Sequence, residues 1–203
     1  MMERGRVAIL VGSKGRGSNM EAIVRASQEP GFPMEVAVVF APSDTAPAIE
    51  RAQSLGVPVV VLPSEPEAFA QSLLREMAER NVDLLCLAGY MRLIPASVVE
   101  ALRGRILNIH PALLPKFGGK GMYGMRVHEA VLAAGETESG ATVHFVNERY
   151  DEGDILIQRR VPVLPNDTPE TLAARVLEQE HRAYPEAIRI WWERYGKGRK
   201  ASL

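Results

Sequence analysis

Three residues of this chain are of the types that could move a one-carbon acyl group between two amines. Asn108 and His110 stand two positions apart at the end of an apolar run, and Asp151 follows later in Asp-Glu-Gly-Asp. An amide can hold a developing oxyanion, an imidazole can transfer a proton, and a carboxylate can orient the imidazole and favour its protonated form. If residues 105–109 form a strand, alternation sends the Asn108 and His110 side chains to one side of the backbone.

The same residues allow a simpler interpretation. A strand can end in an amide and a histidine before a proline turn without any chemistry, and Pro111 does follow His110. The proximity of Asp151 to His110 is a prediction about the fold, since the two residues are far apart along the chain.

A glycine-rich turn follows the first apolar run, in Gly12-Ser13-Lys14-Gly15-Arg16-Gly17-Ser18-Asn19. Such a turn at the start of a helix offers unpaired backbone N–H groups and the positive end of the helix dipole to an anion. The sequence fits neither a P-loop nor the dinucleotide fingerprint, in which Met20 would occupy the last glycine position. We therefore expect a site for one phosphate, with a tight turn into a helix cap as the alternative.

The remaining histidines and the one cysteine are weaker candidates. His144 lies in a predicted strand and fits either a core position or a supporting role near a ligand, whereas His128 is expected on the surface of a short helix. His181 stands beside Glu180 on the last helix. Cys86 lies in an apolar run and is expected to be a core residue. No His or Cys pair has the spacing of metal ligands, so we predict no metal.

Length, charge and composition limit the number of domains and the kinds of partner that we expect for this chain. The chain has 203 residues, with a net charge of −1 and 46% hydrophobic residues, which suits one globular domain over residues 1–203 and gives no electrostatic case for nucleic acid or membrane partners. No apolar run reaches the length of a membrane-spanning helix, and we expect a cytoplasmic protein. The basic residues near the end predict a flexible tail over residues 196–203.

Apolar runs alternate with amphipathic stretches, which is typical of parallel strands joined by helices. Strands are expected at residues 6–12, 35–40, 57–62, 82–88 and 105–109, with a hairpin of residues 140–147 and 153–163 at the sheet edge. Helices are expected at residues 19–28, 45–55, 67–80, 96–103, 126–134 and 169–195. The predicted fold is a three-layer α/β domain, with a mostly parallel, Rossmann-like sheet covered by helices on both faces.

Several motifs together resemble the folate-dependent formyltransferases. They are Asn108-Ile109-His110-Pro111, Leu113-Leu114-Pro115, Thr142-Val143-His144-Phe145-Val146 and Asp151-Glu152-Gly153. Gly17-Ser18-Asn19, Ala88-Gly89-Tyr90-Met91-Arg92 and Glu178-Gln179-Glu180-His181 are similar to the branch of that family that formylates 5′-phosphoribosylglycinamide in purine (IMP) biosynthesis.

The resemblance implies a reaction and a set of roles. The amine of the ribonucleotide attacks the formyl carbon of 10-formyltetrahydrofolate, a co-substrate, through a tetrahedral intermediate. Asn108 then holds the oxyanion, His110 donates a proton, and Asp151 raises the pKa of His110. The binding roles that it implies are phosphate contacts from Gly17, Ser18 and Asn19, a ribose contact from Glu180, and a folate pocket formed by Met91, Arg92, Leu93, Ile94, Asn108, Asn147 and Glu148.

Two features depart from the family pattern. A basic residue that can meet the folate glutamate tail aligns with Pro66, which implies that another basic side chain serves there. Residues 118–125 form a longer, more glycine-rich loop than in some relatives, and we expect it to order over substrate.

Other functions share parts of this pattern. Methionyl-tRNA formyltransferase, sugar-amine formyltransferases and formyltetrahydrofolate hydrolase have the same Asn, His and Asp, although they usually carry further regions that a chain of this length has no room for. A non-catalytic module that binds a phosphorylated metabolite would need the glycine turn alone. The residues leave open whether the chain forms a homodimer.

Overall fold

The apolar runs of the sequence form one sheet at the centre of the molecule. The computed structural model describes residues 3–201, and its sheet has the strand order β3-β2-β1-β4-β5-β6-β7. The strands are β1 (Gly5–Val11), β2 (Met34–Ala41), β3 (Val59–Val61), β4 (Leu84–Ala88), β5 (Ile106–His110), β6 (Glu138–Phe145) and β7 (Ile155–Pro162). Strands β1 to β5 pair in parallel, whereas β6 pairs antiparallel with both of its neighbours. The predicted sheet and edge hairpin are confirmed.

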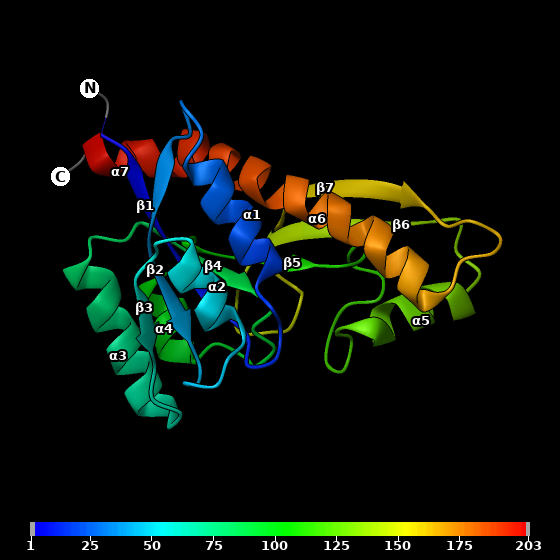
Figure 1. Cartoon of the computed structure of the whole chain (residues 1–203), viewed down its shortest axis with the longest axis horizontal. Helices are drawn as coiled ribbons and strands as arrows, with labels where there is room; N and C mark the ends of the chain where they lie inside the picture. Colours follow the sequence, from blue (N-terminus) through cyan, green and yellow to red (C-terminus); the bar gives the residue numbers. More distant parts are fainter. Residues whose placement is uncertain (1–2, 202–203) are drawn as a thin grey trace.

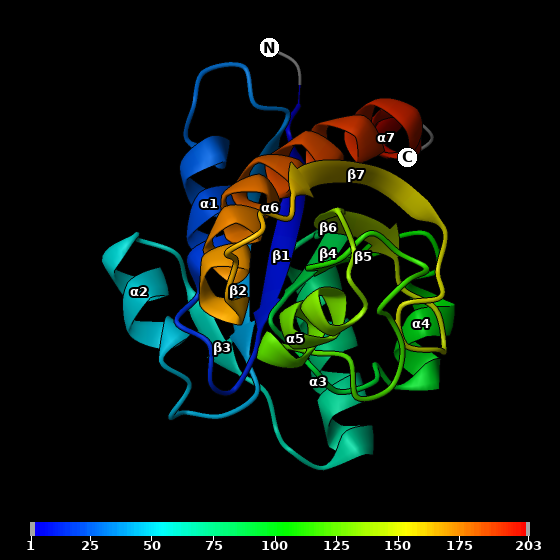
Figure 2. The same cartoon turned by 90° about the vertical axis from the view of Figure 1, so that its right-hand side faces the viewer.

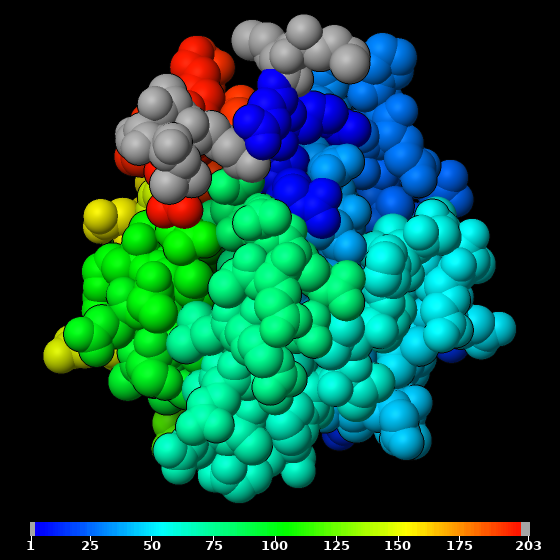
Figure 3. Space-filling model, turned by 90° about the vertical axis from the view of Figure 1, so that its left-hand side faces the viewer, coloured from blue at the N-terminus to red at the C-terminus, as the bar shows by residue number. Residues whose placement is uncertain are grey.

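Helices cover both faces of this sheet, so the predicted three-layer arrangement is also confirmed (Figures 1 and 2). They are α1 (Ser18–Ser27), α2 (Ala48–Ser54), α3 (Pro66–Glu79), α4 (Ala96–Ala101), α5 (Met125–Ala133) and α6 (Pro169–Trp191). The buried side chains form two clusters, one for each face. Helices α1, α2, α5 and α6 contribute to the first cluster, and α3 and α4 to the second. Figure 3 shows α3, in teal, in the middle of the side of the molecule that faces the viewer.

Amphipathic periodicity explains which side of each helix is buried. On α3, Phe69, Leu73 and Met77 recur at four-residue spacing and pack in the second cluster. On α6, the residues predicted to face the sheet are fully buried, namely Leu172, Val176, Ile188 and Trp191. Cys86 is buried in β4, and burial raises the pKa of its thiol, which agrees with a core position and not with a nucleophile.

Pro66 fits the start of α3. Pro66 is the first residue of the helix, where a missing N–H costs nothing. The Glu65 carboxylate caps the same turn by accepting from the N–H groups of Glu67 and Ala68, at 3.0 and 2.8 Å. Position 66 therefore serves helix initiation here.

The C-terminal region is helical as far as the structure describes it. Helix α6 continues through a π-helical segment η1 (Trp192–Gly196) into α7 (Lys197–Ala201). Most of the predicted flexible tail therefore falls in α7, and residues 202–203 lie outside the described residues. The start of β1 and α7 lie at the same end of the molecule (Figure 1). Within residues 3–201, no helix has both the length and the apolar character needed to cross a bilayer.

Candidate active site

The carboxyl ends of β1 and β4 meet where the strand order reverses direction. Chain order runs from β1 outward through β2 and β3, and β4 then returns to the other side of β1. Gly12 and Gly89 follow these two strands, and a Cβ at Gly12 would lie 2.0 Å from the Gly89 carbonyl oxygen. Only glycine allows this approach, and such a switch point is where open α/β sheets bind ligands.

Strand pairing places Asn108 and His110 beside a second pair of polar residues. In the antiparallel register of β5 and β6, Asn108 lies opposite His144 and His110 lies opposite Thr142. Opposite residues of paired strands point to the same face. The two residues predicted to share a side of β5 therefore face the same region as His144.

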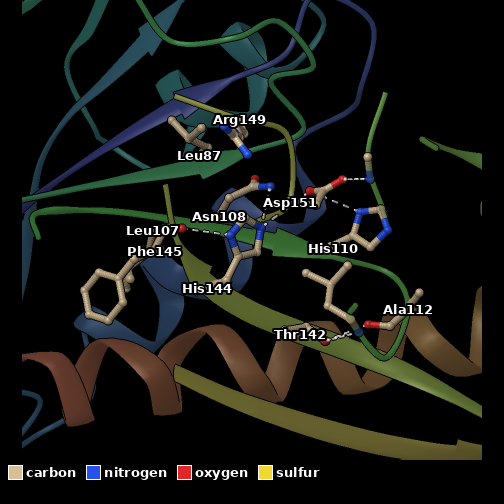
Figure 4. A network of polar contacts seen from close by, with 12 residues as sticks. Leu87, Leu107, Asn108, His110, Ala112, Thr142, His144, Phe145, Arg149 and Asp151 are labelled. Carbon is tan, nitrogen blue, oxygen red and sulfur yellow. Dashed lines mark hydrogen bonds and ion pairs between the residues drawn. The ribbon is translucent and has the colours of Figure 1, made fainter. Parts of the chain in front are cut away.

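The structure brings Asp151 to the two strands. Its carboxylate oxygen Oδ1 lies 3.5 Å from Nδ1 of His110, and the two side chains are only 10% and 5% exposed. The other carboxylate oxygen, Oδ2, accepts from the Gly119 N–H at 3.0 Å. Figure 4 shows Asp151, which lies in the loop that joins β6 to β7, between the two imidazoles. The amide, imidazole and carboxylate thus converge as predicted.

His110 is more strongly affected by burial than by its carboxylate partner. Burial lowers the pKa of His110, and the charge of Asp151 and the Phe117 carbonyl offset this only in part. Asp151 thus acts in the predicted direction, but the pKa of His110 lies below its ordinary value. The ring also donates from Nε2 to the Phe117 carbonyl oxygen at 2.7 Å.

Asp151 is held as a carboxylate. Burial raises its pKa, but His144, His110 and the Gly119 N–H together lower it below the ordinary value. Its backbone has a φ of 55°, a left-handed conformation that a non-glycine residue seldom adopts. Strain of this kind concentrates at functional sites.

His144 is more central to the site than the sequence indicated. Its Nε2 lies 3.3 Å from the Asn108 amide nitrogen and 3.5 Å from Oδ1 of Asp151, and its Nδ1 lies 3.0 Å from the Phe145 carbonyl oxygen. The alternating pattern of residues 142–145 predicted a strand. Its register against β5, which sequence pattern alone does not provide, places the ring against Asn108.

The glycine turn leads directly into α1. Gly17 is the residue before the helix, with a φ of 83°, and no side chain caps the helix start. A Cβ at Gly17 would lie 2.9 Å from the Ala48 Cβ and from the Met20 Cε. The backbone N–H groups at the start of α1 are therefore without a side-chain cap, which suits an anion.

Asn19 and Glu180 connect this turn to α6. The Asn19 amide donates to the Glu180 carboxylate at 3.1 Å. Within the described part of the chain, the Asn19 amide oxygen is buried without a hydrogen-bond partner. Burial raises the pKa of Glu180 to about 7, although the Asn19 hydrogen bond lowers it in part. A carboxyl group with this pKa changes charge near neutral pH.

One cavity of about 740 Å³ joins most of these residues. Its lining includes the predicted residues Asn19, Met91, Arg92, Leu93, Ile94, Asn108, His110, Asn147, Asp151 and Glu180. Glu148 does not line it. That side chain pairs with Arg103 and lines a neighbouring hollow that shares Leu93 and Asp151 with the main cavity.

Two further parts of the cavity lining lie outside the set of predicted catalytic and binding residues. His128 was expected on the surface, but its side chain is only 4% exposed and lines the cavity. Its Nδ1 is buried without a hydrogen-bond partner among the described residues. Residues 119–125 of the glycine-rich loop line the cavity too, with Tyr123 and Met125 exposed. Exposed apolar side chains at a cavity mouth are typical of a ligand site.

Within residues 3–201, no group of three or more His, Cys, Asp or Glu side chains is arranged to hold a metal ion. The Asn108 amide, the His110 imidazole and the Asp151 carboxylate are groups that can form hydrogen bonds, and the last two can also exchange protons.

Comparison with known proteins gives consistent matches. Residues 5–188 match the family model described as Formyl transferase. A phosphoribosylglycinamide formyltransferase, chloroplastic, from Vigna unguiculata is 43% identical over 205 residues, which cover 96% of this chain and 65% of that protein. The chain thus spans slightly less than two thirds of the length of this plant relative.

Solved structures match over nearly their full length. Phosphoribosylglycinamide formyltransferase from Brucella melitensis is 44% identical, with a TM-score of 0.85, over 93% of this chain and 96% of that one. Glycinamide ribonucleotide transformylase 1 from Symbiobacterium toebii is 41% identical, with a TM-score of 0.85, over 94% of this chain and 88% of that one.

Proposed function

The chain belongs to the formyl transferase family, and we propose that it transfers a formyl group from 10-formyltetrahydrofolate to the amine of 5′-phosphoribosylglycinamide in purine biosynthesis. The observation that carries this proposal is the convergence of Asn108, His110 and Asp151 on a cavity that also contains Asn19 of the phosphate turn. The names of the matched relatives support this choice of substrates.

The ribonucleotide would lie between α1 and α6. Its phosphate would accept from the uncapped N–H groups that follow Gly17, where the helix dipole also favours an anion. Glu180 would accept from a ribose hydroxyl, and the free oxygen of the Asn19 amide could do the same. Because Asn19, Glu180 and His110 line the same cavity, the amine of the ribonucleotide would then lie on the side of His110.

The folate would occupy the other arm of the cavity. Residues 91–94 line it together with residues 146, 147 and 149–151, and Met91 and Leu93 are 55% and 46% exposed there. Exposed apolar side chains fit an aromatic ring system, while the irregular backbone after β4 offers N–H and C=O groups to its polar edge. The residues present thus fit a formyl folate as second substrate.

The reaction needs one proton to move. As the amine nitrogen bonds to the formyl carbon, Asn108 donates to the developing oxyanion, an interaction worth about 3 kcal/mol in comparable sites. His110, whose pKa is lowered by burial, is ready to accept the proton that the amine loses. Asp151 stabilises the imidazolium, which then donates the proton to the departing folate nitrogen, so the C–N bond to folate breaks and free tetrahydrofolate leaves.

A formyl-transfer assay tests the proposal. Wild-type protein with both substrates should consume the folate formyl group, followed by absorbance, only when the ribonucleotide is present. Loss of the formyl group without an acceptor would indicate a hydrolase instead, and transfer to methionyl-tRNA or an amino sugar would indicate another branch of the family. His110→Ala should abolish most activity, with Ser139→Ala, a buried change at the far end of β6, as the matched control.

A predicted location accompanies this function. The cytoplasm remains our prediction, and the word chloroplastic in the Vigna unguiculata name describes that protein.

A further inference from the structure

We propose that His144 is a positioning residue that orients the Asn108 amide through its own tautomer. The inference rests on the proposed function, because it concerns the donor that would face the oxyanion. Figure 4 shows the contacts that carry it, with the His144 ring between Phe145 on one side and Asn108 and Asp151 on the other.

The backbone carbonyl of Phe145 determines which ring nitrogen of His144 carries the proton. Nδ1 lies 3.0 Å from the Phe145 carbonyl oxygen, and a carbonyl oxygen can only accept a hydrogen bond. Nδ1 must therefore donate. In the neutral ring the other nitrogen, Nε2, then has only a lone pair to offer.

The lone pair on Nε2 of His144 can accept a hydrogen bond from the nitrogen of the Asn108 amide but not from its oxygen. The amide nitrogen lies 3.3 Å from Nε2 of His144, so one of its two hydrogens is donated there. The amide oxygen could not take this place, because two acceptors would then face each other. The amide is thereby held in one orientation, and the second hydrogen of the same nitrogen remains for a ligand.

Asp151 is the competing partner of Nε2 of His144. Oδ1 of Asp151 lies 3.5 Å from Nε2 of His144 and 3.5 Å from Nδ1 of His110. The contact of Nε2 with the Asn108 amide nitrogen is shorter, at 3.3 Å, so we assign the lone pair of Nε2 to the Asn108 N–H. A proton on Nε2 would instead be donated to Asp151, and that outcome would overturn the proposal.

Burial makes this arrangement stable. The His144 side chain is 3% exposed, and strand pairing sets it directly opposite Asn108. A ring so enclosed has little freedom to turn, so it can fix the geometry of its neighbour.

Three variants test the proposal by activity. His144→Leu removes the acceptor and should lower kcat about 100-fold with little change in KM for either substrate. His144→Gln offers a side-chain oxygen at similar reach and should recover about 10-fold or more of that loss. In an Asn108→Ala background, His144→Leu should change kcat by less than about 3-fold, because the group it positions is already absent. Independent multiplication of the two effects would overturn the proposal, as would equal activity of the Leu and Gln variants.

Nitrogen NMR of the wild-type protein tests the tautomer without any substrate. Histidine labelled with ¹⁵N should show a protonated Nδ1 and an unprotonated Nε2 for His144, identified by loss of the signals in His144→Gln. A protonated Nε2 at a pH where the enzyme works would overturn the proposal, even if the leucine variant does not fold. If wild-type protein shows no formyl transfer, the proposed function fails while the tautomer result still stands. Ser139→Ala is the control for disturbance of β6.

Discussion

Replacing Asp151 with Asn is the change that most directly probes the proton-transfer step. The variant keeps the shape of the side chain and an oxygen for the Gly119 N–H, and removes the charge that lies 3.5 Å from His110. At that distance two unit charges interact by about 1 kcal/mol in water and about 5 kcal/mol at an effective dielectric constant of about 20. Because both side chains are nearly buried, the value for this pair lies between these limits.

The stabilisation lost is that of the imidazolium form of His110. A loss of about 1–5 kcal/mol corresponds to a decrease in rate of about 5-fold to about 5000-fold, and we expect kcat to fall about 100-fold. Burial already lowers the pKa of His110, and loss of the carboxylate lowers it further. Because the reaction uses the unprotonated imidazole as the proton acceptor, the pH below which kcat declines should be lower in the variant than in the wild-type protein.

The assay is kcat for formyl transfer between about pH 5 and about pH 9, together with KM for the ribonucleotide. Glu152→Gln is the matched control, because it removes a neighbouring carboxylate that is 57% exposed. Asp151→Asn with wild-type kcat and an unchanged pH profile would refute the reasoning. A rise in KM as large as the fall in kcat would show that Asp151 serves binding instead.

Three further predictions follow from the site. Asn108→Ala should lower kcat about 100-fold to 1000-fold while the ribonucleotide still binds, and a variant with full kcat would contradict its role at the oxyanion. Burial raises the pKa of Glu180 from 4.5 to about 7. The folded protein is therefore destabilised as the pH rises from about 4.5 to about 7, and the full loss above about pH 7 is about 3 kcal/mol. Glu180→Gln should therefore raise Tm at about pH 8 but hardly at about pH 4.5, and equal shifts at both would refute this assignment. Gly17→Ala should destabilise the protein by about 1–2 kcal/mol and raise KM for the ribonucleotide, because φ is 83° and Ala48 is close. Gly15→Ala is the control, because a Cβ at Gly15 would meet nothing within 4 Å, and it should change neither the stability nor the KM. Denaturant unfolding of the two variants measures the difference in stability.

Local pattern alone predicted the elements of this fold. The apolar runs and four-residue stripes identified the strands and helices, because burial on a sheet or a helix imposes a period that is visible in one segment. The same local argument predicted that Asn108 and His110 share a side of β5, and that a glycine turn precedes α1. Element ends were less well predicted: α2 begins at Ala48, three residues later than expected.

Only the tertiary structure decided how these parts act on one another. The distance between Asp151 and His110 depends on how a long loop returns to the sheet, and the contact of His144 with Asn108 depends on strand register. His128 is buried because α5 packs against α6, although the short helix that carries it was expected to leave it on the surface. The pKa of His110 falls because burial outweighs a nearby charge. Sequence supplies the chemical groups and their local geometry, whereas solvent exposure and long-range distances, which set their reactivity, arise only when the chain is folded.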